Sequence, residues 1–560
     1  MLTAAQSERG VVAAGHALEV EAGRRVFAEG GNAVDAVVAA AFAGFVVEPA
    51  SCGLGGYGHL ALLIGAKRAF LTIDHGPRAP AGASPDMFTL MDNDGRGEYD
   101  WPAVEGRRNE VGPLAVAVPG AVAGLWEAHQ AAGRLPWAQL LAPAIEIADS
   151  GLDVTWSLVL PIVERLENIR QLPTAASFLL RNGDPPCPGD YWRPQDGLDT
   201  TALAKTLREI AKHGAAGFHT GKVAERIGQA VHAAGGILTT ADLEGYRPKV
   251  MTEPPATYQN YSYVTANDQV GYEALNILDL LKVSQVVPGS ADHYHLMAEA
   301  MSCAFVDNVG YYGDPDLVSV PLRGLASREF AQQRAASIRR DRAAPRPVQP
   351  GDPWPFEPGA PAERRGHSTG RSPGTTQMAA ADAEGNLAAL ITTVGHDFGS
   401  LVYVPEVGIF LNSSMVNFDP RPGRSNSIAP GAMPFFAVPS IVASCKDGSG
   451  FAACGSGGYR ILSGVLHTLV NVIDFKMPVA QAVGAPRMHC QGGEIFVDHR
   501  IPQNVRERLT ELGHKVVVQH AVPGFEPFAR VSAVTLHRDG PRMVLEAASD
   551  PPWSTAASGV

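Results

Sequence analysis

The segment from Ser372 to Thr393 constrains the fold most, because it predicts a β-hairpin that follows a long irregular stretch. Two runs of small and apolar residues flank the turn Ala383-Glu-Gly-Asn386. Glycine and asparagine tolerate the positive φ angles that tight hairpin turns need. Counting outward from this turn, an antiparallel register places the hydroxyl of Thr375 near that of Thr393.

The two threonines have two interpretations. Facing threonines in a hairpin are usually a structural cross-strand pair. Alternatively, the chain is cut between Gly374 and Thr375, which would give Thr375 a free amine beside its hydroxyl. Such a threonine carries its own base, one of the standard ways to activate a weak nucleophile. Gly374 suits this alternative, because glycine lets the backbone adopt conformations that bulkier residues resist.

Residues 339–374, directly before the hairpin, are expected to form a flexible loop. Proline, glycine and arginine dominate this stretch and no helix or strand periodicity remains. An irregular segment of this length inside a compact domain is usually functional or disordered. Its end at Thr375 is where a processing event would need access.

The rest of the chain predicts a mixture of helices and strands. Asn32 should cap a helix with Asp35 at the capping-box position, and the alanine- and valine-rich residues that follow predict full burial. Residues 114–124 read as a strand, a Pro-Gly turn and the start of a helix. Further helices are expected over 19–29, 204–212, 222–234, 272–281 and 461–475, and strands over 59–64, 258–266, 408–412, 436–444 and 450–454.

Two glycine-rich loops are candidates for function. Gly53-Leu-Gly-Gly56 precedes a strand, whereas a nucleotide-binding turn follows a strand and opens a helix, so close backbone packing or a loop shaped around a ligand is favoured. Gly455-Ser-Gly-Gly458 does follow a strand and opens a long apolar helix. Backbone N–H groups at the positive end of a helix can form an oxyanion hole, but a tight turn for close packing explains the glycines equally well.

Composition narrows the class of protein. The 560 residues suit one large composite domain or two to three domains, and 45% hydrophobic with 18% charged residues is typical of a globular chain. A net charge of -12 argues against nucleic acid as the main partner. The six cysteines form no CxxC pair, so we expect free buried thiols and no metal. The first residues lack the apolar core of a signal peptide, and the apolar run 33–47 is too short to span a bilayer, which predicts a cytoplasmic protein without a membrane partner.

Several segments together resemble the γ-glutamyltransferase (γ-glutamyltranspeptidase) family of N-terminal-nucleophile (Ntn) hydrolases. They occur in the family's order over nearly the whole chain. They are Gly30-Gly-Asn-Ala-Val-Asp-Ala36, Val47-Glu-Pro49, Gly53-Leu-Gly-Gly56, Val118-Pro-Gly-Ala-Val-Ala-Gly124, Tyr312-Gly-Asp-Pro-Asp316, Gly374-Thr-Thr376, Asp382-Ala-Glu-Gly-Asn386, Gly408-Ile-Phe-Leu-Asn412, Gly455-Ser-Gly-Gly-Tyr-Arg460 and Ala485-Pro-Arg-Met-His489.

The resemblance implies an α+β fold, a four-layer αββα sandwich formed by both halves of an autoprocessed chain. Cleavage before Thr375 would give a large, helix-rich subunit, 1–374, and a small subunit, 375–560, that carries the nucleophile. Thr393 would position Thr375, and Gly457 and Gly458 would donate the oxyanion-hole N–H groups. The resemblance implies no cofactor, and it leaves a higher homo-oligomer open.

The chain departs from the family around the substrate. The family binds the glutamyl α-amine with an acid where this chain has Asn417, and the family's paired serines appear here as Phe435 and Phe436. Losing a charged partner should weaken γ-glutamyl binding by about 1.5–3 kcal/mol. We therefore expect an amidase for a small or dicarboxylate-like acyl group that need not carry an α-amine. The candidate substrate-binding residues are Arg78, His396, Ser414, Asn417, Phe435, Phe436 and Tyr459.

Three alternatives stay open at this point. The chain could be a true glutathione hydrolase and γ-glutamyltransferase with a rearranged glutamyl pocket. It could also keep the nucleophile but cleave a carbon–carbon bond to an activated acyl group. Finally, it could be a catalytically silent relative that binds a ligand without cleaving itself.

Overall fold

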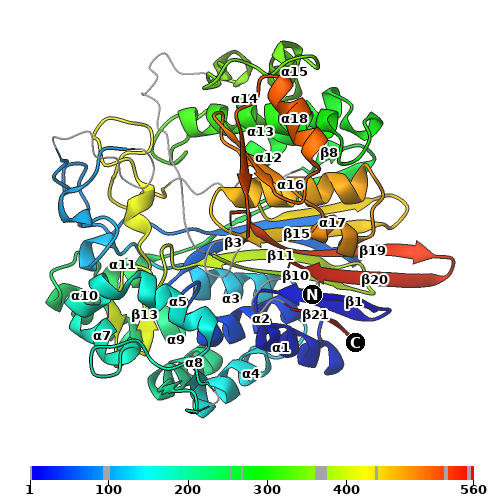
Figure 1. The fold of residues 1–560 in the computed structure, drawn as a ribbon. Helices are drawn as coiled ribbons and strands as arrows, with labels where there is room; N and C mark the ends of the chain where they lie inside the picture. The colour runs from blue at the N-terminus through cyan, green and yellow to red at the C-terminus, as the bar shows by residue number, and fades with distance from the viewer. Residues whose placement is uncertain are drawn as a thin grey trace.

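The computed structural model describes residues 3–91, 101–190, 192–252, 254–266, 269–359, 375–434, 439–521, 527–550 and 556–560 (Figure 1). Within these ranges, two sheets of seven strands each dominate the architecture, and all neighbouring strands in both sheets pair antiparallel. The sheets pack face to face, with β10 and β11 of one sheet against β15 and β19 of the other.

The sheet that contains the hairpin, called the hairpin sheet here, takes strands from both ends of the chain. Its order is β21 (Ala556–Gly559), β2 (Gly10–Ala14), β10 (Thr376–Asp382), β11 (Leu387–Thr393), β3 (Tyr57–Ile64), β4 (Ala69–His75) and β7 (Lys249–Met251). The facing sheet has the order β1 (Thr3–Ser7), β20 (Arg542–Ser549), β19 (Arg530–Asp539), β15 (Gly450–Ser456), β14 (Ile441–Cys445), β9 (Tyr261–Thr265) and β8 (Ala256–Tyr258). Each sheet therefore combines strands from before and after residue 375.

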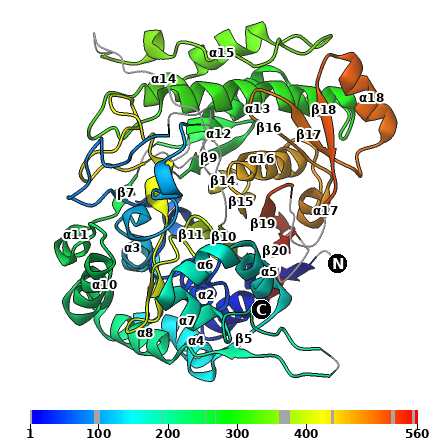
Figure 2. The same cartoon turned by 60° about the vertical axis from the view of Figure 1, so that its left-hand side comes forward.

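Helices cover the outer face of each sheet, which gives four layers (Figures 1 and 2). The hairpin sheet packs against α1 (Ala17–Ala28), α2 (Ala33–Val47) and α3 (Ala121–Ala132), with α4 (Trp137–Ser150) and α8 (Thr201–His213) behind them. The facing sheet packs against α16 (Arg460–Ile473) and α17 (Val479–Gly484), with α12 (Gln269–Leu280) and α13 (Ala291–Tyr311) beyond. The predicted αββα sandwich is therefore confirmed.

Smaller elements complete the described part of the chain. The remaining helices are α5 (Trp156–Glu164), α6 (Leu166–Gln171), α7 (Pro173–Leu179), α9 (Ala216–His219), α10 (Gly221–Ala233), α11 (Thr240–Gly245), α14 (Leu322–Ala326), α15 (Arg328–Ser337) and α18 (Gln503–Glu511). Short strands form three minor sheets: β5 (Leu152–Asp153) with β6 (Gly197–Leu198), β12 (Tyr403–Val404) with β13 (Ile409–Phe410), and β16 (Met488–Cys490) with β17 (Ile495–Asp498) and β18 (Val516–Gln519).

The hairpin strands are buried on both faces, which explains their continuous small and apolar sequence. Met378 and Ala380 of β10 pack with the helices of the outer layer, whereas Ala379 and Ala381 pack between the two sheets. Alternate residues of a strand point to opposite faces, so a strand in the middle of this sandwich needs apolar residues at every position. Alanine allows the layers to approach closely.

Helix α2 follows the expected pattern. Asn32 caps its N-terminus, the capping box with Asp35 is present, and all fifteen residues of the helix are buried. The expected strand at 114–118 is wrong: this stretch holds a 3₁₀ turn, Pro113–Ala115, and then an isolated bridge between Val118 and Arg78. The segment 258–266 divides into β8, a turn and β9.

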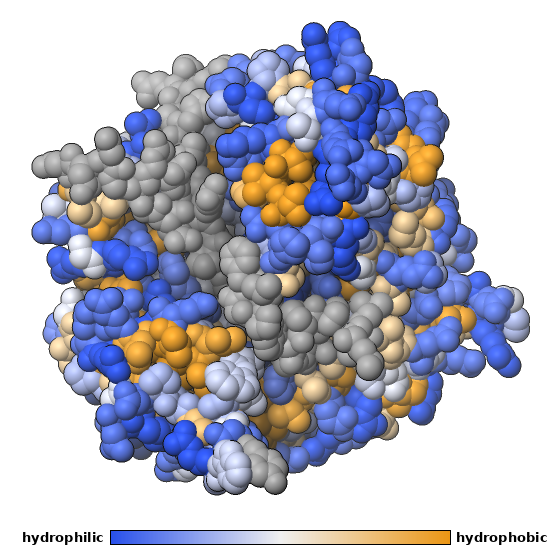
Figure 3. Space-filling view, viewed as in Figure 1, coloured by the Kyte–Doolittle hydropathy of each residue, from blue (hydrophilic) through white to orange (hydrophobic). Residues whose placement is uncertain are grey.

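The face in Figure 3 is mainly hydrophilic, with small hydrophobic patches, one of them around α5, where Val163 is exposed. All six cysteines are free and buried. None of the described helices has the length and apolar character needed to cross a bilayer.

Candidate active site

The two candidate catalytic threonines lie at the same end of neighbouring strands. Thr376 pairs with Thr392, and continuing this antiparallel register by one residue sets Thr375 opposite Thr393. Thr393 pairs in turn with Tyr57 at the start of β3. Thr375, Thr393 and Tyr57 thus form a row across three neighbouring strands, at the end where β10 and β3 begin and β11 ends. All three side chains are buried, with Thr375 only 2% exposed.

Glycines fix the backbone around Thr393. The hydroxyl of Thr393 accepts a hydrogen bond from the N–H of Gly395 at 2.9 Å, and Gly395 has a φ of +91° that favours glycine. A Cβ on Gly56 would lie 2.3 Å from the carbonyl oxygen of Thr393, and one on Gly55 would lie 2.2 Å from that of Phe410. The loop Gly53–Gly56 therefore serves close backbone packing against the candidate site, one of the two roles favoured for it from sequence.

Asn412 joins three segments behind this row. Its Nδ2 donates to the carbonyl oxygens of Gly55 and Ala117, each at 2.9 Å. Its Oδ1 accepts from the N–H groups of Ala117 and Ser414, each at 3.1 Å. One buried amide side chain thus satisfies backbone groups of the glycine-rich loop, of residues 116–118 and of the segment that leads to Ser414.

Asn417 and Ser414 lie beside Tyr57. The Nδ2 of Asn417 donates to Tyr57 Oη at 3.1 Å and to Ser414 Oγ at 3.2 Å. Both residues belong to the 3₁₀ turn Ser414–Asn417 and are buried. Burial raises the pKa of Tyr57 to about 12, while hydrogen bonds to Ser414 and Asn417 oppose the rise, so the phenol is neutral at physiological pH. This trio makes an uncharged polar surface next to the threonine row.

Gly457 and Gly458 follow β15 in the facing sheet, directly before α16. Their φ angles are +124° and +63°. The carbonyl oxygen of Gly457 accepts from Arg460 Nε at 2.9 Å, and that of Gly458 from the N–H of Ile461 at 3.0 Å, which fixes the orientation of both peptides.

Contacts between the two sheets join β15, the strand that leads into this turn, to β10, the strand that follows Thr375. Cys454 Sγ donates to the carbonyl oxygen of Met378 at 3.1 Å. Nearer the end of β15, Ser456 Oγ accepts from Arg530 Nε at 3.0 Å. Cys454 lies three residues before Gly457, and Met378 lies three residues after Thr375.

Two other candidate substrate-binding residues are placed as follows. The N–H of His396 donates to Ser413 Oγ at 3.0 Å, and its Nδ1 lies 3.1 Å from the same oxygen, so the ring is held against the segment before Ser414. Tyr459 is buried at the start of α16, with its ring edge-to-face against Phe305. These positions keep both residues near the turns that carry Thr393 and Gly458.

Arg78 lies three residues after β4, the strand next to β3. Its guanidinium is 3.5 Å from Asp314 and donates to the carbonyl oxygen of Gly431 at 3.2 Å. The arginine is therefore already paired with a carboxylate, and its side chain is 22% exposed. Among the described residues, its polar contacts join it to Asp314, Gly431 and Val118.

A cavity of about 100 Å³ opens close to Arg78, between β4 and β7 on one side and β9 with α12 on the other. Asp74, Lys249 and Met433 contribute to its wall. Burial raises the pKa of Asp74 to about 6, whereas the N–H of Gly76 and the charges of Arg78 and Lys249 lower it. The cavity thus combines a cation with a carboxyl group that titrates near neutral pH.

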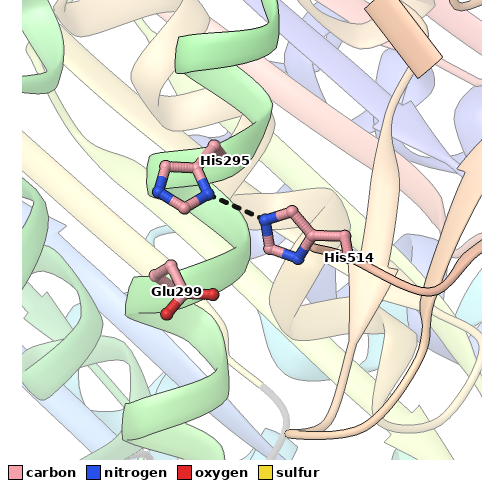
Figure 4. A group of neighbouring side chains, drawn as sticks. All are labelled: His295, Glu299 and His514. Carbon is pink, nitrogen blue, oxygen red and sulfur yellow. Dashed lines mark hydrogen bonds between the residues drawn. The ribbon is translucent and has the colours of Figure 1, made fainter. Parts of the chain in front are cut away.

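The described residues include one group with the spacing of a metal site: His295 and Glu299 from α13, and His514 from the turn before β18 (Figure 4). His295 Nδ1 and His514 Nε2 are 2.7 Å apart, a hydrogen-bond distance, whereas two imidazole ligands of tetrahedral zinc would be about 3.4 Å apart. Glu299 already pairs with Arg346. Burial first, then the charges of His295 and Arg346, lower the pKa of His514 to about 3, so a cation is disfavoured there. This geometry fits a hydrogen-bonded polar cluster better than a metal site.

The polar cluster also holds part of the segment that was expected to be a flexible loop. His295 Nε2 contacts the carbonyl oxygen of Arg339 at 2.7 Å, and Glu299 accepts from the N–H of Ala344 at 3.2 Å. Residues 339–353 contain no regular helix or strand but are tied to α13 by such contacts. Residues 360–374 lie outside the described residues, so the flexibility of the stretch before Thr375 stays a prediction. Gly374, Phe435 and Phe436 also lie outside them.

Sequence reasoning missed three residues that the structure adds to the site. Asn412 was quoted only as part of a motif, and Tyr57 was given no polar role. Glu48 was quoted in Val47-Glu-Pro49, yet its Oε2 accepts from Thr376 Oγ1 at 2.5 Å. An acid in a mostly apolar stretch was the available signal, but its partner is 328 residues away in the chain.

The fold and the threonine row together define an αββα sandwich with a candidate nucleophile at the start of a central strand, the arrangement of Ntn hydrolases. The family model described as Gamma-glutamyltranspeptidase matches residues 20–560. The chain therefore belongs to the gamma-glutamyltranspeptidase family, and it is an Ntn hydrolase, an enzyme of the class that acts on amide bonds.

Similar proteins carry two kinds of name. The chain is 33% identical over 543 residues to the acylase ACY 1 proenzyme of Pseudomonas sp. (strain V22), which covers 96% of this chain and 91% of the relative. It is also 33% identical over 519 residues to the glutathione hydrolase proenzyme of Bacillus subtilis (strain 168), covering 90% and 85%. The crystal structure of cephalosporin acylase from Bacillus halodurans superposes with a TM-score of 0.81 at 26% identity, covering 100% of this chain and 97% of that one.

Proposed function

We propose that the chain is an autoprocessing amidohydrolase in which Thr375, freed by cleavage after Gly374, forms the acyl-enzyme. In this mechanism the new α-amine takes the proton from the threonine hydroxyl, and Oγ1 attacks the amide carbonyl. The amine leaving group departs with a proton, and water then hydrolyses the ester. Thr393 orients the nucleophile, and the N–H groups of Gly457 and Gly458 hold the oxyanion. The pairing of Thr376 with Thr392, which sets Thr375 opposite Thr393, supports the role of Thr393. The contact of Cys454 with Met378 joins the strand before Gly457 to the strand after Thr375.

The acyl group is proposed to lack an α-amine. In the family an acid receives that amine, whereas here the position is Asn417, an uncharged residue bonded to two neutral hydroxyls. A ligand ammonium would have to be desolvated beside this trio without a counter-charge, which is unfavourable. A glutaryl-like acyl group has the same chain and a free carboxylate but no ammonium. Arg78 and His396 are candidates to bind that carboxylate.

Self-cleavage is tested on a denaturing gel of the purified protein. We expect two chains, with the smaller one beginning Thr-Thr-Gln-Met, and a single uncleaved chain for Thr375→Ala. Thr201→Ala, on an exposed helix start far from the hairpin, is the matched control and should cleave like the wild type. One stable chain in the wild type would contradict the proposal and favour the silent, ligand-binding alternative.

Acyl specificity is tested with two substrates that differ in a single group, glutaryl p-nitroanilide and γ-glutamyl p-nitroanilide. We expect a higher kcat/KM for the glutaryl compound. Glutathione hydrolase is the second candidate, supported by the 33% identity to the Bacillus subtilis enzyme. A clear preference for the γ-glutamyl compound would replace the first candidate with the second.

A further inference from the structure

A pair of carboxyl groups lies directly behind the start of the hairpin. Glu48, at the C-terminal end of α2, accepts a hydrogen bond from the hydroxyl of Thr376 at 2.5 Å. Glu19 of α1 lies next to Glu48 and is fully buried. Its Oε2 accepts from the N–H of His16 at 2.9 Å as part of a capping box. The two acids come from different helices and meet beside the residue that follows the proposed nucleophile.

The two carboxyl groups lie close enough to interact directly. Burial raises the pKa of Glu19 well above its usual value, and the charge of Glu48 and a hydrogen bond to it raise it further, against the weaker effects of the His16 N–H and the more distant Arg530. Two carboxyls in contact cannot both ionise easily when buried. Glu19 therefore holds a proton that it can donate in a hydrogen bond to Glu48, whose Oε2 also accepts from Thr376 Oγ1; this is called the shared proton below. His16 and Cys52 are the other titratable groups that feel this charge.

Two glycines make the room that these groups occupy. A Cβ on Gly15 would lie 2.6 Å from Thr376 Oγ1, 2.8 Å from Glu48 Oε2 and 3.5 Å from Glu19 Oε2. A Cβ on Gly44 would lie 2.3 Å from Glu19 Oε1. Real Cβ atoms essentially never come within 3.0 Å of other atoms, as the contacts with Thr376 Oγ1, Glu48 Oε2 and Glu19 Oε1 would require. The backbone of the β2–α1 loop and of α2 is thus shaped around the contact between the carboxyls and the threonine hydroxyl.

We propose that Glu48, backed by Glu19, is a positioning residue for the N-terminal threonine, because it anchors Thr376 and thereby sets where Thr375 points. The proposal rests on the proposed role of Thr375 as the nucleophile. Glu48 touches neither substrate nor the reacting atoms in this account; it acts through Thr376.

Cleavage makes this anchor necessary. In the precursor, the chain holds Thr375 from both sides. After cleavage, Thr376 is its only covalent neighbour, and a chain end gains rotational freedom that costs precise geometry. A misplacement of about 1 Å in a reacting group can lower the rate about 100-fold. A hydrogen bond from the next residue to a carboxylate fixed in a helix end limits that freedom, since charge-assisted hydrogen bonds are short and strong.

The shared proton gives the anchor a pH dependence. When the pH rises through the raised pKa of Glu19, the protonated acid loses its proton and faces the charge of Glu48. The hydrogen bond between them is lost, the two carboxylates repel, and the anchor on Thr376 loosens. The anchor is therefore complete below this pKa and weakens above it, which adds a decline to the alkaline side of the kcat profile.

The test compares Thr376→Val with Thr376→Ser, two variants that differ in the hydroxyl. We expect Thr376→Val to cleave itself like the wild type, because the intact chain holds Thr375 from both sides, and to lower kcat for glutaryl p-nitroanilide about 10- to 100-fold, with KM changed less than about 3-fold. Thr376→Ser keeps the hydroxyl and should stay within about 3-fold of the wild type. Wild-type kcat in Thr376→Val, or an equal loss in both variants, would overturn the proposal.

Glu19→Gln tests the shared proton separately. Glutamine donates to Glu48 at every pH, so the alkaline decline of kcat should move to higher pH while kcat at neutral pH is retained. An unchanged pH profile in a folded, cleaved Glu19→Gln protein would refute the shared proton. Thr375→Ala distinguishes failure of the proposed function from failure of the anchor proposal. If Thr375→Ala keeps its activity, the proposed function is wrong. If Thr375→Ala is inactive but Thr376→Val has wild-type activity, only the proposed role of Glu48 is wrong.

Discussion

Replacing Asn417 with aspartate should move the enzyme toward γ-glutamyl substrates. The change puts a carboxylate where the amide now donates to Tyr57 Oη and Ser414 Oγ. Both hydroxyls can rotate and donate instead. Tyr57 is able to do so because its raised pKa of about 12 keeps the phenol protonated. The new carboxylate is thus solvated by two donors and can pair with the α-ammonium of a γ-glutamyl group.

The magnitude follows from the difference between neutral and charged hydrogen bonds. A hydrogen bond to a charged group contributes about 1.5–3 kcal/mol, and one between neutral groups about 1 kcal/mol. The gain for the ammonium substrate is therefore about 0.5–2 kcal/mol, or roughly 2- to 30-fold in the ratio of kcat/KM. Because the side chain is only 2% exposed, the charge should also lower the free energy of unfolding of the empty enzyme by about 1–3 kcal/mol.

The assay measures kcat/KM for γ-glutamyl and glutaryl p-nitroanilide on the same enzyme preparation. Asn417→Asp should raise the γ-glutamyl to glutaryl ratio at least about 2-fold. Asn417→Leu, which removes the polar group without adding charge, should lower both values and leave the ratio near that of the wild type. An Asn417→Asp ratio equal to that of Asn417→Leu would show that residue 417 does not face the α-carbon of the acyl group, and the argument for acyl specificity would fall.

Three further changes test other parts of the site. Gly457→Ala should lower kcat at least 100-fold, because φ is +124° and the new Cβ would lie 3.1 Å from Ala529 Cα; Gly540→Ala, also at positive φ but in open space, should leave kcat unchanged, and equal kcat values would contradict the oxyanion-hole role. Asn412→Ala should lower the free energy of unfolding by about 3–5 kcal/mol in a urea titration, since four backbone groups lose their partner; a change below about 1 kcal/mol would refute this. Asp74→Asn should become more stable than the wild type by roughly 1–3 kcal/mol as the pH rises from about 4 to about 7. In the folded wild type, burial raises the pKa of Asp74 to about 6, so the carboxyl holds a proton that the unfolded chain releases near pH 4. The stability of the wild type therefore falls as the pH rises. A pH-independent difference between the two proteins would show that Asp74 is not shifted.

Local sequence patterns predicted the hairpin and the capped helix well. The turn Ala383–Asn386 and the capping box of Asn32 depend on residues within four positions of each other, so their chemistry is visible in a short window. The stretch 114–118 failed for the opposite reason. Its apolar residues suggested a strand, but its backbone is held by Arg78 and by Asn412, and the latter is 295 residues away.

The same limit applies to the site. The candidate nucleophile and its partner lie on one hairpin, so a register argument could bring them together. The groups that would position the nucleophile and select the acyl group are distant in sequence. Asn417 contacts Tyr57 across 360 residues, and Thr376 contacts Glu48 across 328. The periodicity of apolar residues does not reveal such contacts, because they depend on which strands become neighbours in the sheet. Their residue types alone, an asparagine in a turn and an acid after an apolar helix, had more ordinary explanations.

The proposed nucleophile and acyl-binding residues lie on different segments, which explains how one family can include enzymes with different names. The strands that carry Thr375 and Thr393 are buried on both faces, and a change there would disturb two layers at once. Asn417, the last residue of the segment Ser414–Asn417, reaches Tyr57 of the threonine row through its side chain, so its charge can change without altering the hairpin backbone. Acyl preference can therefore shift by single substitutions at the edge of the row while the register that aligns the threonines is kept. The anchor from Glu48 belongs with the buried hairpin strands, and we expect it to be retained wherever the threonine remains the nucleophile.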